Sequence, residues 1–324
     1  MRVLVTGGSG FIGCNLIEEL LRGQNEVYNI DIQLPFNPGQ GAFYHQCDIL
    51  DSTTLRKCFA EFQPEAVVHL AARTDLHHEG TVEPYYNVNT AGTANVLDAV
   101  KATPTVKRVL VASTQYVCRT AVPTGPDDYR PYTTYGMSKV ETEKITKAAN
   151  LSCTWAIVRP TNVWGPWHTF YRDTIIKAIQ KGYYFQPTGR PCRLGFAYVK
   201  NLVKQVSKLL QIEPSLINGK TIYLGDELIT LYDWANAFSL AVKGRNVPKL
   251  PRSGIYLLAK FGDAFGKITG RQFIMFSARY RNMTDDFIVP MQPTFDLLGK
   301  PEIGLEQAVR ETLAWIGKHP GPGI

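Results

Sequence analysis

The sequence predicts an α/β protein with a Rossmann-type doubly wound parallel sheet and a smaller C-terminal substrate-binding lobe. Three observations lead to this fold class. Near-continuous apolar runs alternate with helix-length segments through the first half of the chain, which is typical of parallel strands covered by helices on both faces. A glycine-rich turn follows the first run, and prolines and glycines punctuate the chain after about Arg159. The length of 324 residues suits one large α/β domain with a smaller lobe.

The elements of the first half follow one another in strand–helix order. Each expected strand is a short apolar run, and each expected helix repeats its apolar residues at helical spacing. The strands are Val3–Val5, Glu26–Ile30, Phe43–Cys47, Ala66–Leu70, Arg108–Ala112 and Thr154–Val158. The helices are Phe11–Arg22, Thr53–Phe62, Asn89–Val100 and Tyr135–Asn150.

The second half is richer in aromatic residues and turns. We expect residues 1–160 to form the domain built on the parallel sheet and residues 161–324 to form mainly the smaller lobe. An isolated strand at Thr221–Gly225 is a candidate to return to the main sheet. The helices expected here are Arg172–Lys181, Val199–Gln211, Leu231–Val242 and Leu305–His319.

Composition narrows the class of protein. A hydrophobic content of 44% with 19% charged residues indicates a packed globular chain. No apolar run approaches the ~18 residues of a membrane span, and no signal peptide is recognisable, so the expected location is the cytoplasm. The six cysteines are scattered, which favours buried thiols over a metal site or disulfides. The net charge of +7 is spread without a basic block, so no nucleic-acid partner is expected. Binding of an anionic small substrate, or an ordinary solvated surface, explains the excess of positive charge.

The glycine turn predicts a dinucleotide site. Gly8 to Gly13 fit the pattern G-x-G-x-x-G, and Gly7, Gly10 and Gly13 also fit G-x-x-G-x-x-G. Residues without a Cβ let the backbone approach a pyrophosphate, and the following helix offers free N–H groups to it. Asp31 ends the second strand about 20 residues on, where a carboxylate accepts hydrogen bonds from an adenosine ribose. Because Ile32 and Gln33 carry no positive charge for a 2′-phosphate, NAD is favoured over NADP.

Asp48 is a second acid, at the end of the third expected strand. Two roles suit it, and they are compatible with each other. It could meet the adenine amine, or it could cap the N-terminus of the next helix.

Tyr135 and Lys139 are the candidate acid–base pair. Their spacing of four residues places both side chains on one face of a helix. A neighbouring ammonium lowers the pKa of a tyrosine, whose hydroxyl can then exchange a proton with a substrate alcohol. Ser113 and Thr114 follow the fifth strand, where a hydroxyl could bridge to the substrate oxygen. The ordinary alternative is that these two hydroxyls only turn the chain.

Together these motifs resemble the extended short-chain dehydrogenase/reductases, in the NAD-dependent epimerase/dehydratase group that acts on nucleotide sugars. The resemblance is dense over about half of the chain and looser through "FAYVKNLV" and "GLEQAVRETLAWI". The matching pieces, in the order of the family, are "TGGSGFIG", Asp31, Asp48-Ile49, "HLAA", "NTAGTANVLDA", "STQYV", "YGMSK" and "RPTNVWGP".

The resemblance implies roles for individual residues. Thr114, Tyr135 and Lys139 would form the catalytic set. Asn162 would contact the nucleotide sugar, although it could instead be only a turn residue. Residues 70–72 would line the NAD, although they could instead be only the end of a strand. The full implied cofactor set is Gly7, Gly10, Phe11, Ile12, Gly13, Asp31, Asp48, Ile49, Leu70, Ala71, Ala72, Asn89 and Ser113, with Tyr135 and Lys139.

The sequence departs from the family at the residues that follow the catalytic Thr. Dehydratases of the family carry an acidic pair there, whereas this chain has Gln115 and Tyr116. Elimination of water needs an acid and a base, so dehydration is disfavoured. Epimerase/reductases that act at carbons 3 and 5 use a nearby cysteine, but we expect Cys118 to belong to the core.

The phosphate-binding arginine of the lobe is also displaced. Leu194 stands at its usual position, with Arg193 one residue away. Arg193 and Arg281 are therefore the candidates for binding an anionic substrate, because a guanidinium fork matches a phosphate. Arg190 and Arg279 are further candidates.

These observations favour an NAD-dependent nucleotide-sugar epimerase, acting at carbon 4 through Thr114, Tyr135 and Lys139. One alternative is a reductase, dehydrogenase or dehydratase of a nucleotide sugar. Another is an enzyme for an apolar alcohol or ketone such as a sterol. A nucleotide-sensing protein on the same fold usually lacks the Tyr/Lys pair, which is intact here. The resemblance further implies a homodimer, paired through the two helices that include Asn89–Val100 and Tyr135–Asn150.

Overall fold

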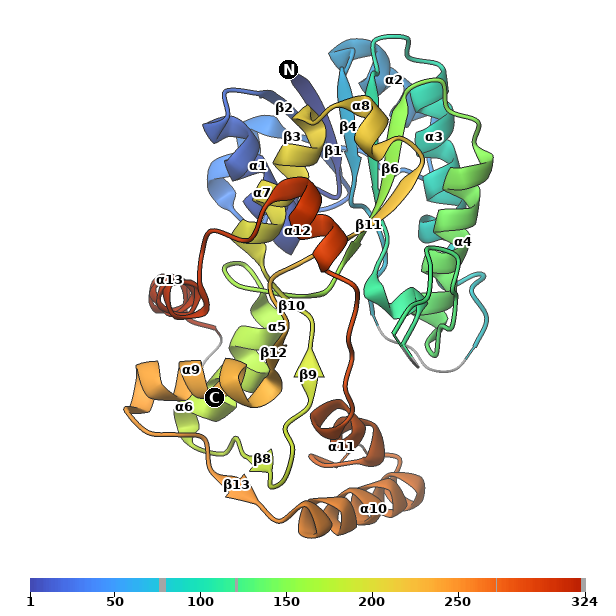
Figure 1. The fold of residues 1–324 in the computed structure, drawn as a ribbon. Coiled ribbons are helices and arrows are strands. Elements are labelled where there is room, and N and C mark those ends of the chain that lie inside the picture. Colours follow the sequence, from blue (N-terminus) through green and yellow to red (C-terminus); the bar gives the residue numbers. More distant parts are fainter. Residues whose placement is uncertain (76–79, 120–121, 272, 322–324) are drawn as a thin grey trace. The chain divides into compact units, whose positions relative to one another are not determined.

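The computed structural model describes residues 1–75, 80–119, 122–271 and 273–321, and its chain divides into two compact units (Figure 1). The first unit consists of Met1–Trp167, Ala197–Asp226 and Val289–Glu302. The second consists of His168–Phe196, Glu227–Ile288 and Ile303–Ile324. This division differs from a single boundary near residue 160, because two later segments belong to the first unit.

A seven-stranded sheet organises the first unit. Every neighbouring pair of strands is parallel. The chain order reverses between β1 and β4, and ligands of doubly wound folds bind in the crevice at the carboxyl ends of such strands. The α/β fold class predicted from the sequence is confirmed. The strand order is β11 (Lys220–Leu224), β6 (Thr154–Pro160), β5 (Arg108–Ala112), β4 (Ala66–His69), β1 (Arg2–Thr6), β2 (Glu26–Asp31) and β3 (Tyr44–Gln46).

Helices cover both faces of this sheet. Side chains alternate along each strand, so Val3 and Val5 of β1 face one layer while Leu4 faces the other. The first layer contains α1 (Phe11–Arg22) and α7 (Val199–Gln211), whose leucines and valines pack on the sheet. The opposite layer contains α2 (Ser52–Phe62), α3 (Thr93–Lys101) and α4 (Thr134–Ala148). Within the opposite layer, apolar residues of α2 and α3 form one cluster with those of the strands.

Shorter elements complete the first unit. A 3-10 turn spans Pro38–Phe43, a second follows β5 at Gln115–Val117, and a π-helical turn at Val88–Gly92 leads into α3. The chain also forms β7 (Asn162–Trp164), which pairs with β10 (Phe196–Tyr198). The short helices α8 (Pro214–Ile217) and α12 (Gln292–Leu298) follow later in the chain.

The second unit is mainly helical and has an aromatic core. Trp234 is fully buried, and its ring stacks on Phe196 at 5.2 Å and approaches Phe238 at 5.0 Å. The helices are α5 (Thr169–Tyr171), α6 (Lys177–Lys181), α9 (Leu231–Lys243), α10 (Arg252–Thr269), α11 (Ser277–Thr284) and α13 (Leu305–Lys318), with a π-helical turn at Arg172–Ile176. The strands are β8 (Gln186–Pro187), β9 (Arg193–Leu194), β12 (Ile229–Thr230) and β13 (Lys249–Leu250).

The second unit also holds the main differences from the expected elements. The helix expected at Arg172–Lys181 consists of a π-helical turn followed by α6. The 18-residue helix α10 was not expected, because glycines interrupt its apolar pattern. Across the described residues, no helix has the length and hydropathy that crossing a bilayer requires.

Candidate active site

The glycine turn after β1 packs against the end of β4. Gly7 has a φ of +71°, and a Cβ at this position would lie 2.5 Å from the backbone nitrogen of Ala71. A Cβ on Gly13 would lie 2.4 Å from the Cα of Gly8, where α1 crosses the turn. Both glycines are therefore required by packing within the protein.

Gly10 differs from its neighbours, because packing within the protein does not require it. A Cβ on Gly10 would meet only the carbonyl oxygen of Gly7, at an ordinary van der Waals distance of 3.6 Å. Gly10 is also the N-cap of α1, where no side chain caps the helix and no acid lies in the first turn. A bare backbone at the positive end of a helix dipole suits close approach of a pyrophosphate. Phe11 and Ile12 begin this helix. The residues present therefore fit the phosphates of a dinucleotide.

Asp31 is oriented by the same turn. Its carboxylate ends β2 and accepts hydrogen bonds from the backbone N–H of Ser9 (3.1 Å) and of Gln33 (3.2 Å). Burial raises the pKa of Asp31, and these backbone donors oppose that shift. The donors hold the carboxylate at the carboxyl edge of the sheet, beside the glycine turn.

Asp48 and Ile49 follow β3. The Asp48 carboxylate accepts a hydrogen bond from the N–H of Leu50 at 2.9 Å. The alternative role of Asp48 as a helix N-cap is wrong, because Asp51 caps α2 by accepting from Thr53 and Thr54. Ile49 is buried under the π-helical turn, where a Cβ on Gly92 would strike its side chain.

A network of buried side chains orients the loop after β4, which includes Leu70, Ala71 and Ala72. The His69 ring contacts the Thr6 hydroxyl at 2.7 Å and the Thr93 hydroxyl at 3.0 Å. The N–H of Ala71 donates to the same Thr6 hydroxyl at 3.2 Å. Burial and the nearby Lys139 ammonium lower the pKa of His69 to about 3, so this ring is neutral. The loop is thus fixed beside the glycine turn.

Asn89 ties this loop to α4. Its Oδ1 accepts from the N–H of Arg73 at 2.8 Å, and its Nδ2 donates to the Arg73 carbonyl and to the Ser138 hydroxyl, both at 2.9 Å. Asn89 is completely buried. Its amide therefore binds protein groups that connect the expected cofactor loop to the helix of Tyr135 and Lys139.

The structure brings Thr114, Tyr135 and Lys139 together. Thr114 follows β5, while Tyr135 and Lys139 lie on α4, which begins after the N-cap Thr133. The Thr114 side chain lies close enough to the Tyr135 hydroxyl to lower its pKa. The exposed fractions are only 6% for Thr114, 8% for Tyr135 and 2% for Lys139. The rings of Tyr86 and Tyr116 lie 6.4 Å from that of Tyr135 and enclose it.

Burial dominates the protonation of this set. It raises the pKa of Tyr135, whereas the nearby Thr114 side chain lowers it. The direction is opposite to the acidification expected from Lys139, because the phenol lies among other tyrosines away from water. Burial also lowers the pKa of Lys139 to about 8, and the Glu143 carboxylate opposes this shift.

Glu143 centres a buried network next to Lys139 that sequence reasoning missed. Its carboxylate is bound by the Arg159 guanidinium through Nε at 2.8 Å and Nη2 at 2.7 Å. The hydroxyls of Ser113 and Tyr129 donate to it at 2.6 Å and 2.9 Å. Ser113, expected to line the cofactor, is therefore a partner of Glu143. The signal available in the sequence was the spacing, because Glu143 lies four residues after Lys139 on the same helix face.

The two residues directly after Thr114 carry no carboxylate. Gln115 is fully buried, and neither polar atom of its amide has a hydrogen-bond partner. Burial raises the pKa of Tyr116 to about 12, so its hydroxyl stays protonated at neutral pH. Cys118 is fully buried.

The expected substrate-binding residues belong to different units. Asn162 lies in β7 of the first unit. Arg193 lies in β9 of the second, where its Nη2 is 3.4 Å from the carboxylate of Asp286, which also binds Arg190. Arg281 lies on α11 and is exposed. Leu194 is buried, so its side chain cannot replace the family's arginine.

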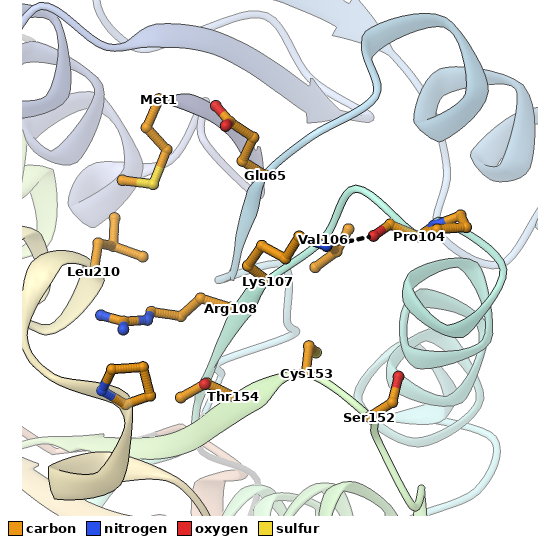
Figure 2. Close-up of a pocket in the computed structure, with 11 residues that line it drawn as sticks. Met1, Glu65, Pro104, Val106, Lys107, Arg108, Ser152, Cys153, Thr154 and Leu210 are labelled. Atoms are coloured by element: carbon orange, nitrogen blue, oxygen red, sulfur yellow. Dashed lines mark hydrogen bonds between the residues drawn. The ribbon is translucent and has the colours of Figure 1, made fainter.

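A separate cavity lies at the opposite edge of the sheet (Figure 2). Its lining includes Met1, Glu65, Arg108 and Thr154, which stand at or just before the starts of four strands. The Arg108 guanidinium donates to backbone carbonyls at the end of α7 and in the next residue, at 2.7 Å each. The cavity is therefore remote from the carboxyl ends of the strands. Among the described residues, no cluster of His, Cys, Asp or Glu could hold a metal ion.

Comparison with known proteins agrees with this geometry. The profile of the NAD dependent epimerase/dehydratase family matches residues 3–225, which confirms the family expected from the motifs and names the expected cofactor. A UDP-glucose 4-epimerase of Vibrio cholerae is 31% identical over 191 residues, 56% of this chain and 57% of that enzyme. A 3-beta-hydroxysteroid dehydrogenase of Mycolicibacterium neoaurum is 28% identical over 275 residues, 78% of this chain and 73% of that enzyme.

Solved structures share the fold. A UDP-glucose 4-epimerase from Thermotoga maritima, solved with UDP-glucose, superposes with a TM-score of 0.73 at 19% identity. The match covers 98% of this chain and 99% of that one.

Proposed function

We propose that this chain inverts carbon 4 of a nucleotide sugar. The chain belongs to the NAD dependent epimerase/dehydratase family and is therefore an NAD-dependent enzyme. One observation carries the proposal. The buried Thr114 and Tyr135 side chains interact on the same carboxyl edge as the glycine turn, and the two residues directly after Thr114 carry no carboxylate. These groups suffice for moving a hydride and a proton, and they lack what dehydration needs.

Tyr135 would exchange the proton of the sugar hydroxyl. NAD, when bound, supplies the hydride acceptor and donor of the reaction. Thr114 would orient the hydroxyl of Tyr135 toward the substrate oxygen. Tyr135 would act as the base while the alcohol is oxidised and as the acid while the ketone is reduced, so its protonation is restored in each turnover. Lys139 would stabilise the tyrosinate, held in place by α4 and by the charge of Glu143.

Several residues would hold the cofactor. The bare backbone at Gly10 and the start of α1 would bind the pyrophosphate, and Asp31 would accept hydrogen bonds from the adenosine ribose. Ala71 and Ala72 would border the cofactor from the end of β4. Asn162, Arg193 and Arg281 would contact the nucleotide sugar, with the two arginines meeting its phosphates.

A substrate panel with two readouts tests the proposal. The purified enzyme with NAD is incubated with UDP-, GDP- and dTDP-hexoses, and products are identified by nuclear magnetic resonance while absorbance at the NADH band is followed. We expect a 4-epimer without net NADH. Tyr135→Phe should lower turnover by roughly 10²–10⁴-fold because only the exchangeable proton is removed. Epimer formation by Tyr135→Phe within a factor of two of the unmodified enzyme would contradict the assignment.

A second candidate is oxidation of an apolar alcohol such as a sterol. It is favoured by the relative from Mycolicibacterium neoaurum, whose match covers more of this chain than the match of the Vibrio cholerae epimerase does. The two reactions differ in their cofactor balance, because oxidation of an alcohol leaves one NADH per product. Stoichiometric NADH with a 3β-hydroxysteroid, and no epimer from any hexose in the panel, would establish this candidate instead.

The functional form is proposed to be a homodimer paired through α3 and α4. This proposal rests on the family resemblance. Packing of the two helices does not point to a dimer by itself, because residues of both helices also pack within the first unit. Sedimentation equilibrium of the full chain tests it, with twice the monomer mass expected. A substitution of the exposed Met137 on α4 by Glu should then favour the monomer.

A further inference from the structure

Helix α10 belongs to the second unit (Figure 1). One of its faces carries exposed apolar side chains. Ile255 and Ala259 are buried on the opposite face, where they pack with Met275. Leu257, Phe261 and Ile268 recur at intervals of four and seven residues, so they lie along one side of the helix. Their exposed fractions are 67%, 57% and 85%.

The exposed face extends beyond the end of the helix. The ring of Phe273 lies 5.4 Å from that of Phe261 and 5.6 Å from that of Phe265. Ile274 follows and is 75% exposed. We call these residues the apolar stripe: Leu257, Phe261, Phe265, Ile268, Phe273 and Ile274. Contiguous apolar surface of this kind marks an interaction site, unlike scattered single residues.

Cations border the apolar stripe. Lys260 and Lys267 are exposed and lie seven residues apart, along one flank of the stripe. Arg252 and Arg271 are exposed at the two ends of α10. Asp263 is the only acid of the helix, and its carboxylate accepts from the N–H of Ser277 at 3.0 Å. The exposed surface of residues 252–271, all of which the structure describes, therefore carries four cations and only the partly exposed carboxylate of Asp263.

We propose that α10 binds the surface of an anionic lipid bilayer. The apolar stripe enters the boundary between headgroups and acyl chains, while Lys260 and Lys267 lie at the level of the lipid phosphates. This is the residue pattern of an interfacial amphipathic helix, which lies in the membrane plane and does not cross it. Charge complementarity selects the bilayer over a second copy of the chain, because pairing two copies through this face would bring their lysines together.

Co-sedimentation of the full-length protein with vesicles tests the proposal independently of the reaction. The unmodified protein should bind vesicles of phosphatidylcholine with about 30% phosphatidylglycerol, because phosphatidylglycerol gives the vesicles a negative surface. Leu257→Gln with Ile268→Gln should lower the partition constant roughly tenfold or more, because two apolar side chains no longer enter the bilayer. Lys260→Gln with Lys267→Gln should lower it by roughly tenfold on these vesicles and little on pure phosphatidylcholine.

Matched controls remove the same groups elsewhere. Leu34→Gln changes a leucine of the first unit that is 74% exposed, and Lys57→Gln with Lys220→Gln removes two other exposed lysines. Both controls should bind vesicles like the unmodified protein. Failure of the unmodified protein to bind anionic vesicles, or equal binding by the stripe variant, would overturn the proposal. A stripe variant that changes the sedimentation mass but not vesicle binding would overturn it too, since the stripe would then pair two copies.

Discussion

Replacing Lys139 by Met should remove a pH dependence from the stability of the protein. Burial lowers the pKa of Lys139 from 10.5 to about 8 in the folded chain. Between these values the unfolded chain binds a proton that the folded chain does not. Stability must therefore rise as the pH increases through this window. The full difference corresponds to roughly 3 kcal/mol, of which about 2 kcal/mol is regained between pH 7 and pH 10.

Urea denaturation of nucleotide-free protein measures this effect. The free energy of unfolding is compared between the unmodified protein and Lys139→Met at pH 7 and at pH 10. The variant should lose about 2 kcal/mol relative to the unmodified protein over this interval, because it lacks the buried amine. Lys144→Met on the same helix, where the side chain is 57% exposed, controls for general effects of alkaline pH. An unchanged difference at the two pH values would refute the reasoning about Lys139.

Three further predictions concern the cofactor site and its support. Gly10→Ala should keep the stability of the protein but weaken NAD binding at least roughly tenfold. Gly13→Ala should destabilise the fold. Calorimetry measures both the stability of each variant and its affinity for NAD. NAD should bind better than NADP, and titration of both cofactors should show that preference shrinking in Asp31→Ala; equal affinities for the unmodified protein would count against this role. Glu143→Gln should cost about 3 kcal/mol in urea denaturation because it leaves the buried Arg159 charge without its partner, and a cost below about 1 kcal/mol would argue against the network.

The sequence predicted the sheet better than it predicted the second unit. Strands such as Arg108–Ala112 are continuous apolar runs, and burial on both faces leaves little ambiguity. Helix α10 escaped prediction because Gly254, Gly262 and Gly266 interrupt it and its apolar residues cover both faces. One of these, Gly262, allows close contact, since a Cβ there would lie 1.8 Å from the carbonyl oxygen of Met275.

The candidate site shows the same limit. Local motifs pointed to Gly10, Tyr135 and Lys139, since a turn and a helical spacing are properties of neighbouring residues. The pairing of Glu143 with Arg159 depends on how α4 packs against β6, which no local pattern encodes. The direction of the Tyr135 pKa shift was missed for a related reason, because burial by Tyr86 and Tyr116 depends on the tertiary fold.

The reaction proposed for this enzyme is tested most directly in heavy water. The enzyme is incubated with NAD and the nucleotide sugar that it converts, and the product is analysed by mass spectrometry after exchangeable deuterium is washed out. Return of the same hydride to carbon 4 predicts a product without carbon-bound deuterium. Deuterium on carbon would contradict 4-epimerisation, because dehydration and epimerisation at carbons 3 and 5 exchange a C–H proton with the solvent.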